Sequence, residues 1–240
     1  HIPLIHGADG AKLSKRHGAL GVEAYRDDGF LPEAVFNYLL RLGWSHGDDE
    51  IISREQAVEW FDLGGVGKSP ARFDIDKLTS LNGHYIRHGD NERLSKFILP
   101  VITEKLGGRV AEGTEIWLNK GLDDLKERAK TIIELADSAL FYAKTRPLTM
   151  DEKATTLLSE DGIEKLCLLH AALADIDDWS ADRLKQSVGD LAEAQDLKLG
   201  KLLQPLRAAL TGTHVSPGMF DVMAVLGREE SLGRLDDVLN

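Results

Sequence analysis

Residues 32–43 read Pro-Glu-Ala-Val-Phe-Asn-Tyr-Leu-Leu-Arg-Leu-Gly, a stretch that contains both the start and the stop of a helix. Pro32 and Glu33 suit a first helical turn, because the amide hydrogen that proline lacks has no partner there in any case. Apolar side chains then recur every three or four residues as far as Gly43, where the helix is expected to end. The pattern predicts an amphipathic helix whose apolar face packs against another element.

Helical signals extend from this stretch to the end of the chain, and almost nothing from residue 74 onward reads as strand. Ser53 and Gln56 have the spacing of a capping box, and Asp74 is suited to cap the helix that follows it. The break at Pro147 is expected to divide the helical part into two subdomains. Helices are predicted at residues 21–28, 32–42, 53–60, 74–87, 90–106, 115–144, 151–174, 180–194, 197–211 and 217–238.

The N-terminal residues favour a different structure. Residues 2–5 read as a short strand, Asp9-Gly10 is a strong two-residue hairpin signal, and the chain then returns toward Lys12. The predicted fold class is therefore mainly α, with a short N-terminal β-hairpin and a small α/β region followed by an all-helical domain. The predicted domains are residues 1–88, 89–147 and 148–240.

The composition limits the kinds of partner. The 240 residues have a formal net charge of −11, from 29 basic and 40 acidic residues, so any contact with a phosphate backbone must be local. The lone cysteine, Cys167, lies in an apolar run and is expected in the core, and the scattered histidines suggest no metal site. No apolar run approaches the ~20 residues of a membrane span, which is compatible with a cytoplasmic protein.

Local basic clusters do occur, and they are separated along the sequence. They consist of Lys12, Lys15, Arg16 and His17; Arg87, His88, Arg93 and Lys96; Lys126, Arg128 and Lys130; and Lys198, Lys201 and Arg207. Any contact with RNA is expected at such clusters rather than over the whole surface.

Residues 12–18, Lys-Leu-Ser-Lys-Arg-His-Gly, place two ammonium groups and a hydroxyl on a short loop after the predicted hairpin. An ammonium group neutralises phosphate oxygens without demanding a planar geometry, and a serine hydroxyl adds a hydrogen bond. The loop is thus suited to a polyphosphate. Taken without its neighbours, the same tetrapeptide is also typical of a solvated basic loop.

A longer pattern surrounds this loop, with parts before it, after it and near the C-terminus. It comprises His1 to Ile5, Tyr25-Arg26, Gly29 to Ala34, Asn37 to Leu39, Leu42 to Ser45, Lys68 to Ala71, Phe73-Asp74, Lys77-Leu78, Leu81-Asn82, Tyr85-Ile86, Gly200-Lys201, Pro205 to Arg207 and Ala209 to Gly212. The pattern closely resembles the bacterial glutamyl-tRNA synthetases. The resemblance is dense over residues 1–88, sparse from about 90 to 195, and moderate at the end.

The resemblance implies a role for the basic loop. Residues 12–18 look like the second signature of class I synthetases, which closes over ATP, used with Mg²⁺, while the amino acid is activated. Lys15 is then the expected catalytic residue, because its ammonium would meet the charge that develops on the phosphate in the transition state. Lys12, Ser14 and Arg16 are expected to bind ATP beside it.

The resemblance also implies a nucleic-acid partner, tRNA(Glu). Residues 1–88 would contain the signature loop and contact the tRNA stem, and the two helical subdomains would bind the anticodon by stacking and base-edge hydrogen bonds. Each candidate also suits a solvated helix face or a packed position, and whether tRNA(Gln) is charged as well stays open. The residues expected to contact tRNA are Tyr25, Arg26, Arg128, Lys130, Arg146, Lys198, Lys201 and Arg207.

One departure from the family pattern is that no Rossmann-type half with a His-x-Gly-His-type motif precedes the loop. We therefore expect the C-terminal half of a monomeric glutamate–tRNA ligase, inactive alone, whose missing N-terminal domain holds glutamate and ATP. The intact enzyme would activate glutamate with ATP and transfer it to tRNA(Glu). The alternative is a stand-alone, non-catalytic helical module that binds RNA or protein and retains the loop only as ancestry.

Overall fold

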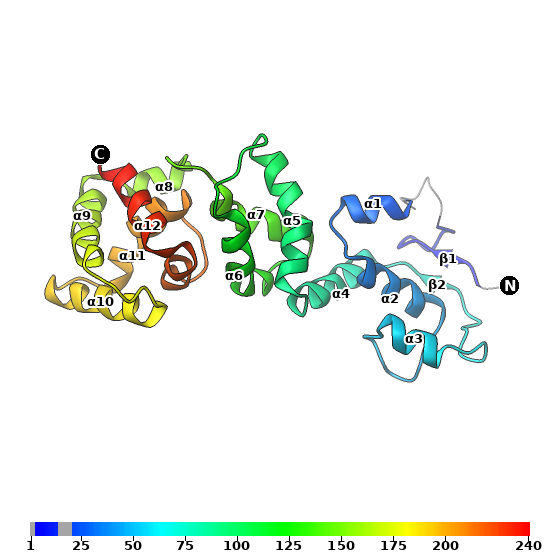
Figure 1. Cartoon of the computed structure of the whole chain (residues 1–240). Helices are drawn as coiled ribbons and strands as arrows, with labels where there is room; N and C mark the ends of the chain where they lie inside the picture. Colours follow the sequence, from blue (N-terminus) through cyan, green and yellow to red (C-terminus); the bar gives the residue numbers. More distant parts are fainter. Residues whose placement is uncertain (1–2, 14–20) are drawn as a thin grey trace. The chain divides into compact units, whose positions relative to one another are not determined.

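A computed structural model describes residues 3–13 and 21–240, and helices dominate this part of the chain (Figure 1). The mainly α fold class is confirmed. The described residues form two compact units, between which the chain passes three times. Unit 1 comprises residues 1–90 and 126–135, and unit 2 comprises residues 91–125 and 136–240. The three-part division at residues 88 and 147 stays a prediction.

The N-terminal part of unit 1 contains a small sheet. Strand β1 (Ile5–His6) pairs in parallel with β2 (Ala71–Arg72), and His6 also forms an antiparallel bridge with Lys12. The predicted turn back toward Lys12 is therefore present, although its strand lies later than the residues 2–5 expected for it. The pairing with β2 had no sequence signal, because β2 has only two residues and its partner lies far away in the sequence.

The helices of unit 1 begin and end close to the predicted positions. Ser53 Oγ accepts a hydrogen bond from Gln56 N at 3.1 Å and Gln56 Oε1 accepts one from Ser53 N at 2.9 Å, which confirms the capping box. Asp74 caps its helix by accepting from two backbone amides. These helices are α1 (Val22–Asp27), α2 (Pro32–Gly43), α3 (Arg54–Trp60) and α4 (Ile75–Arg87).

Two buried asparagines hold unit 1 together. Asn82 on α4 accepts a hydrogen bond from Leu31 N at 2.7 Å and donates to Lys130 O at 2.6 Å. Asn37 on α2 accepts from Ile52 N at 2.8 Å and from the Tyr85 hydroxyl at 2.7 Å. Because a buried amide group is costly unless it is bonded, these contacts fix α2 and α4 relative to the loops around them.

The apolar face of α2 packs as the sequence predicted. Tyr38 is 4% exposed and lies with Phe30, Val35 and Leu78 in one hydrophobic cluster. Its hydroxyl accepts a hydrogen bond from Asp74 N at 2.7 Å, at the start of α4. Tyr38 is therefore a core aromatic with its polar end bonded.

The other helices belong wholly or mostly to unit 2. Two long helices expected from the sequence are each interrupted: residues 127–131 separate α6 from α7, and residues 158–159 separate α8 from α9, where Ser159 caps α9. The helices are α5 (Asn91–Lys105), α6 (Thr114–Lys126), α7 (Ile132–Ala143), α8 (Glu152–Leu157), α9 (Glu160–Ala174), α10 (Ala181–Ala194), α11 (Leu199–Thr211) and α12 (Met219–Leu239).

Two details of unit 2 differ from expectation. Helix α12 bends at Gly227, whose φ of +81° suits glycine, and Trp179 Nε1 donates to Met223 O at 2.9 Å in the turn before the bend. Cys167 is exposed rather than buried, because it lies on α9 between Leu166 and Leu169, which both face the core. The prediction of a core cysteine was wrong.

Neither unit has a helix in its described residues that is both long and apolar enough to cross a membrane. Residues 3–13 and 21–240 also contain no group of three or more His, Cys, Asp or Glu side chains placed to hold a metal ion.

Candidate functional site

The N-terminal hairpin presents the first lysine of the basic loop on a bonded backbone. Gly7 N donates to Ala11 O at 2.9 Å, and Leu13 N donates to Ile5 O at 2.8 Å, so the residues on both sides of Lys12 are held. The Lys12 side chain is exposed, and its backbone is bridged to His6. An exposed ammonium on such a base fits a phosphate oxygen. Ser14, Lys15 and Arg16 lie outside the described residues.

Tyr25 and Arg26, expected to contact tRNA, have different surroundings on α1. The Tyr25 ring is half-buried and packs against Phe30 and Phe73, with centroid distances of 6.0 Å to each. Arg26 is exposed and bonds Asp27 at 2.9 Å. An exposed pair of this kind contributes little to stability, so Arg26 can exchange Asp27 for a phosphate at small cost.

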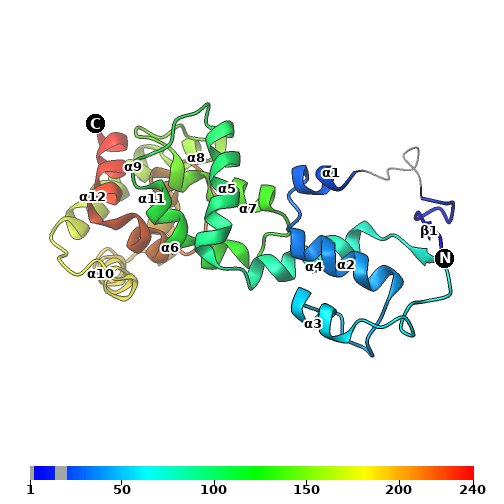
Figure 2. The same ribbon diagram turned by 45° about the vertical axis from the view of Figure 1, so that its right-hand side comes forward.

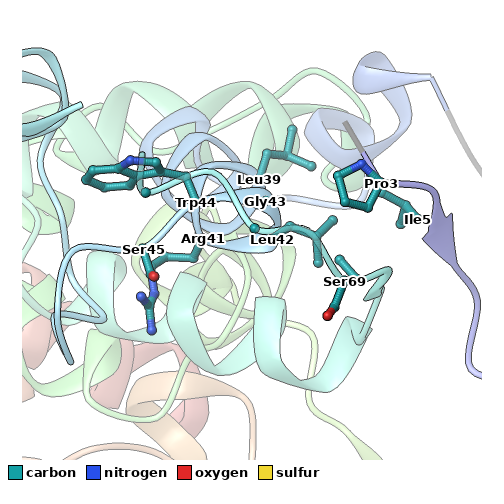
Figure 3. Close-up of a pocket in the computed structure, with 12 residues that line it drawn as sticks. Pro3, Ile5, Leu39, Arg41, Leu42, Gly43, Trp44, Ser45 and Ser69 are labelled. Atoms are coloured by element: carbon teal, nitrogen blue, oxygen red, sulfur yellow. The ribbon is translucent and has the colours of Figure 1, made fainter. Parts of the chain in front are cut away.

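A hollow of about 240 Å³ lies between β1, the end of α2 and the segment before β2 (Figure 3). Pro3 and Ile5 line it from the N-terminal side, and Leu39 and Leu42 line it from α2. Trp44, also in the lining, is buried, and its Nε1 donates to Asp62 O at 3.1 Å, as expected for a packing residue. The mostly apolar lining makes this hollow a packing feature rather than a catalytic centre.

Two basic clusters that are separated in the sequence meet in unit 1. A Cβ atom on Gly83 would lie 3.4 Å from Arg87 Nη1 and 3.6 Å from both Ala129 O and Lys130 Cα. Lys126 Nζ donates to Gly89 O at 3.3 Å, which joins the same two segments. The exposed candidates Arg128 and Lys130 therefore lie in the segment beside the end of α4.

The candidates in unit 2 fall into two groups. Lys198 and Lys201 are exposed at the N-terminal end of α11. Arg207 is half-buried and donates from Nε to Ser216 Oγ at 2.9 Å, and Arg146 makes two bonds to Asp237, at 2.7 and 2.9 Å. Lys198 and Lys201 are thus presented to solvent, whereas Arg207 and Arg146 already have protein partners.

The pair formed by Arg146 and Asp237 predicts a pH effect. Hydrogen bonds from Arg146 hold the pKa of the Asp237 carboxyl below its ordinary value of 3.8. A carboxylate with a lowered folded-state pKa stabilises the fold above about pH 3.8, and this stability is lost as the pH falls through the folded value. Replacing Asp237 with asparagine is expected to lower stability at pH 7 by about 1 kcal/mol and to reduce the further loss at pH 3.

Urea unfolding of both proteins at pH 7 and pH 3 measures this difference. Asp190→Asn, which removes one exposed carboxylate from α10, is the matched control and is expected to leave the pH dependence nearly unchanged. An Asp237→Asn protein that loses as much stability on acidification as the parent would contradict the assignment.

The sequence analysis missed a set of side chains between α2 and α4. Arg41, Lys77, His84 and Arg87 line one hollow in unit 1, and only Arg87 had been noted as part of a basic cluster. The available signal was the spacing of 77, 84 and 87, which places those three on one side of a helix. Arg41 comes from α2 and had no such signal.

Comparison with known families agrees with these features. A family model described as an anticodon binding domain matches residues 92–239, and one described as the catalytic domain of class I tRNA synthetases (E and Q) matches residues 1–80. The first match covers nearly all of the residues assigned to unit 2, together with the part of unit 1 at residues 126–135.

Individual relatives agree with the family models. The chain is 60% identical over 240 residues to glutamate–tRNA ligase 2 of Paramagnetospirillum magneticum and 62% identical to that of Rhizorhabdus wittichii, covering 50% and 51% of them. A crystal structure of a glutamate tRNA ligase from Elizabethkingia meningosepticum matches with a TM-score of 0.80 and 30% identity, over all of this chain and 50% of that one.

The chain thus spans about half the length of the curated relatives it matches. The family models matched by the helical part and by the N-terminal part, together with the solved structure, all indicate the same family. The chain belongs to the bacterial glutamyl-tRNA synthetase family, and an anticodon-binding domain occupies its residues 92–239.

Proposed function

We propose that this chain is the tRNA-binding part of a glutamate–tRNA ligase, and that it also supplies the loop that contacts ATP. In the intact enzyme, glutamate is activated with ATP and then transferred to tRNA(Glu). The observation that supports this most is the match of residues 92–239 to an anticodon-binding domain, since it coincides with the helical unit that presents Lys198 and Lys201. The enzyme is proposed to be a cytoplasmic monomer.

The basic loop has a defined task in this proposal. Lys15 stabilises the negative charge that develops on the phosphate during activation, and Lys12, Ser14 and Arg16 position the triphosphate. The exposed side chain of Lys12 and the bonded hairpin beneath it support this role. Mg²⁺ is proposed to accompany ATP, because a divalent ion bridges the phosphate oxygens and neutralises their charge.

Recognition of tRNA is divided between the two units. Contacts to phosphates, from residues such as Arg26, Arg128 and Lys130, are proposed to position the molecule. Contacts to splayed-out bases, from Lys198 and Lys201, are proposed to read the anticodon. Arg146 and Arg207 would have to leave Asp237 and Ser216 to take part, and Tyr25 would have to offer the edge of a packed ring.

The test is to titrate the 240-residue chain with tRNA(Glu) and with the same tRNA carrying a substituted anticodon. A hydrogen bond from a charged side chain to a base contributes about 1.5 to 3 kcal/mol, so we expect the substituted tRNA to bind at least about tenfold more weakly. Equal affinity for the two would contradict anticodon reading. Absence of binding to either would contradict tRNA recognition altogether and favour the stand-alone module.

A further inference from the structure

Unit 2 contains a group of basic side chains around the C-terminal half of α12, which packs against α11 (Figures 1 and 2). Arg234 lies on α12, and Lys144 and Arg146 follow the end of α7. The Arg146 guanidinium occupies the space that a side chain on Gly233 would fill, so it crosses the α12 backbone beside Arg234. We call Lys144, Arg146 and Arg234 the α12 basic cluster.

Two hydrogen-bond donors in this region are buried without a protein partner. Arg234 is 1% exposed and Ser231 is 0% exposed. Within residues 3–13 and 21–240, no atom accepts a hydrogen bond from Arg234 Nη2 or from the Ser231 hydroxyl. The two residues are three apart on α12, a spacing that places side chains on one side of a helix. Because an unpaired buried donor is costly, the site favours an acceptor that reaches both groups.

The other donors of Arg234 are already used. Its Nε donates to Glu230 at 2.7 Å, and its Nη1 donates to Phe141 O at 3.0 Å and to Leu210 O at 2.6 Å. Because the guanidinium is planar and rigid, these bonds also fix the direction of Nη2. An acceptor for Nη2 therefore has to lie at one defined place beside α12.

The α12 basic cluster holds one more positive charge than its bonded carboxylates. Glu230 bonds Arg234, and Asp237 bonds Arg146 through two hydrogen bonds. Lys144 is the third cation, and in the described part of the chain neither carboxylate pairs with it. One monovalent anion would therefore make the group neutral.

Lys144 lies close to the same end of α11 that Arg234 bonds. Its Nζ is 3.3 Å from the position that a Cβ on Gly212 would take, and Gly212 follows Leu210 by two residues. Burial lowers the pKa of Lys144, Asp151 acts in the opposite direction, and the charge of Arg234 lowers it further. Arg234 and Lys144 are therefore near enough for their charges to repel each other. An anion placed between them would relieve that repulsion.

We propose that the α12 basic cluster binds one small inorganic anion of the chloride type, held by Arg234 Nη2, the Ser231 hydroxyl and the Lys144 ammonium. Hydrogen bonds from charged donors to an anion are stronger than those between neutral groups. The bound anion would join the end of α7 to α12 and stabilise unit 2. This inference does not rest on the proposed function, because it concerns the folded chain alone.

The experiment follows thermal unfolding of the 240-residue chain while sodium chloride replaces sodium gluconate at constant ionic strength. One anion bound only by the folded chain raises the ratio of folded to unfolded protein tenfold for each tenfold increase in chloride above its Kd. For a domain of this size, that factor corresponds to a rise in Tm of about 3 to 6 °C. A Tm that does not depend on chloride would overturn the proposal and leave an ordered water as the acceptor.

The variant Ser231→Ala separates the anion from the fold. Removing a buried hydroxyl that has no protein partner costs little by itself, so the variant is expected to match the parent Tm in gluconate. It is expected to lose most of the rise in chloride. Ser95→Ala on α5 is the matched control, because Ser95 Oγ is also buried with no partner in the described residues, and it should keep the whole rise. Equal chloride dependence in the two variants would contradict the site.

The variant Lys144→Gln tests the charge. Without this cation the cluster is already neutral, so the rise of Tm in chloride is expected to shrink strongly. Lys153→Gln, which removes an exposed lysine from α8, is the control and should behave as the parent does. The line width of the chloride NMR signal gives a direct reading: the parent should broaden it more than Lys144→Gln does. Parent-like broadening and a parent-like rise in Lys144→Gln would show that the proposal is wrong.

Discussion

Replacing Lys15 with alanine in the full-length ligase is expected to slow ATP–pyrophosphate exchange by about 100- to 1,000-fold. The ammonium of Lys15 is proposed to meet charge that is larger in the transition state than in bound ATP, so its loss should lower kcat more than it raises KM. The hairpin that precedes the loop is held by its own backbone bonds, from Gly7 N to Ala11 O and from Leu13 N to Ile5 O.

Two controls separate this effect from general loss of charge or folding. Lys68→Ala removes an exposed lysine outside the loop and is expected to leave exchange nearly unchanged. The Lys15→Ala protein is also expected to bind tRNA(Glu) with the parent affinity, because the anticodon-binding match lies at residues 92–239. Exchange at the parent rate in Lys15→Ala would remove this residue from the mechanism.

Replacing Arg234 with methionine is expected to destabilise unit 2 by about 3 to 5 kcal/mol. Arg234 on α12 has a side chain with 0% exposure and bonds Glu230 Oε1 at 2.7 Å. It also donates to Phe141 O at 3.0 Å and Leu210 O at 2.6 Å, which joins the ends of α7 and α11. Methionine would leave these acceptors and the Glu230 carboxylate without their donor.

Urea unfolding of parent and variant measures this loss. Arg228→Met is the matched control, because Arg228 lies on the same helix and is exposed, with one hydrogen bond to Ala174 O. It is expected to cost about 1 kcal/mol or less. Adding Glu230→Leu to Arg234→Met should recover part of the stability, since the half-buried carboxylate that lost its partner is then removed as well. Equal midpoints for parent and Arg234→Met would show that the buried guanidinium is not needed.

Local signals in the sequence account for most helix positions. Pro32 begins α2, Ser53 begins α3 and Asp74 begins α4 because each supplies or avoids a hydrogen bond at the helix start, which depends only on near neighbours. Tyr38 lies in the core on the apolar face predicted for α2, since an apolar spacing of three or four residues describes the buried side of a helix. Such features need no knowledge of the tertiary structure.

The helix predicted at 115–144 shows where local signals fail. Residues 127–131 contain no glycine or proline, yet the helix stops there. The reason lies elsewhere in the chain: Asn82 bonds Lys130 O, and Ile132 N donates to Gly29 O at 2.9 Å. Hydrogen bonds to these two distant segments replace the ones that a continuous helix would make. No residue close in the sequence indicates them.

By itself the sequence determined the mainly α class, the family resemblance and the loop suited to phosphates, because these depend on residue types at short spacing. Only the tertiary structure decided which basic side chains are presented to solvent and which are bonded to a protein partner. It placed Arg41 and Lys77 in the lining of one hollow, brought Arg87 and the Lys130 backbone close to Gly83, and paired Arg146 with Asp237. The physical reason is that the residue type alone does not show whether a charged side chain is solvated or paired. Its binding role depends on neighbours that folding brings near it.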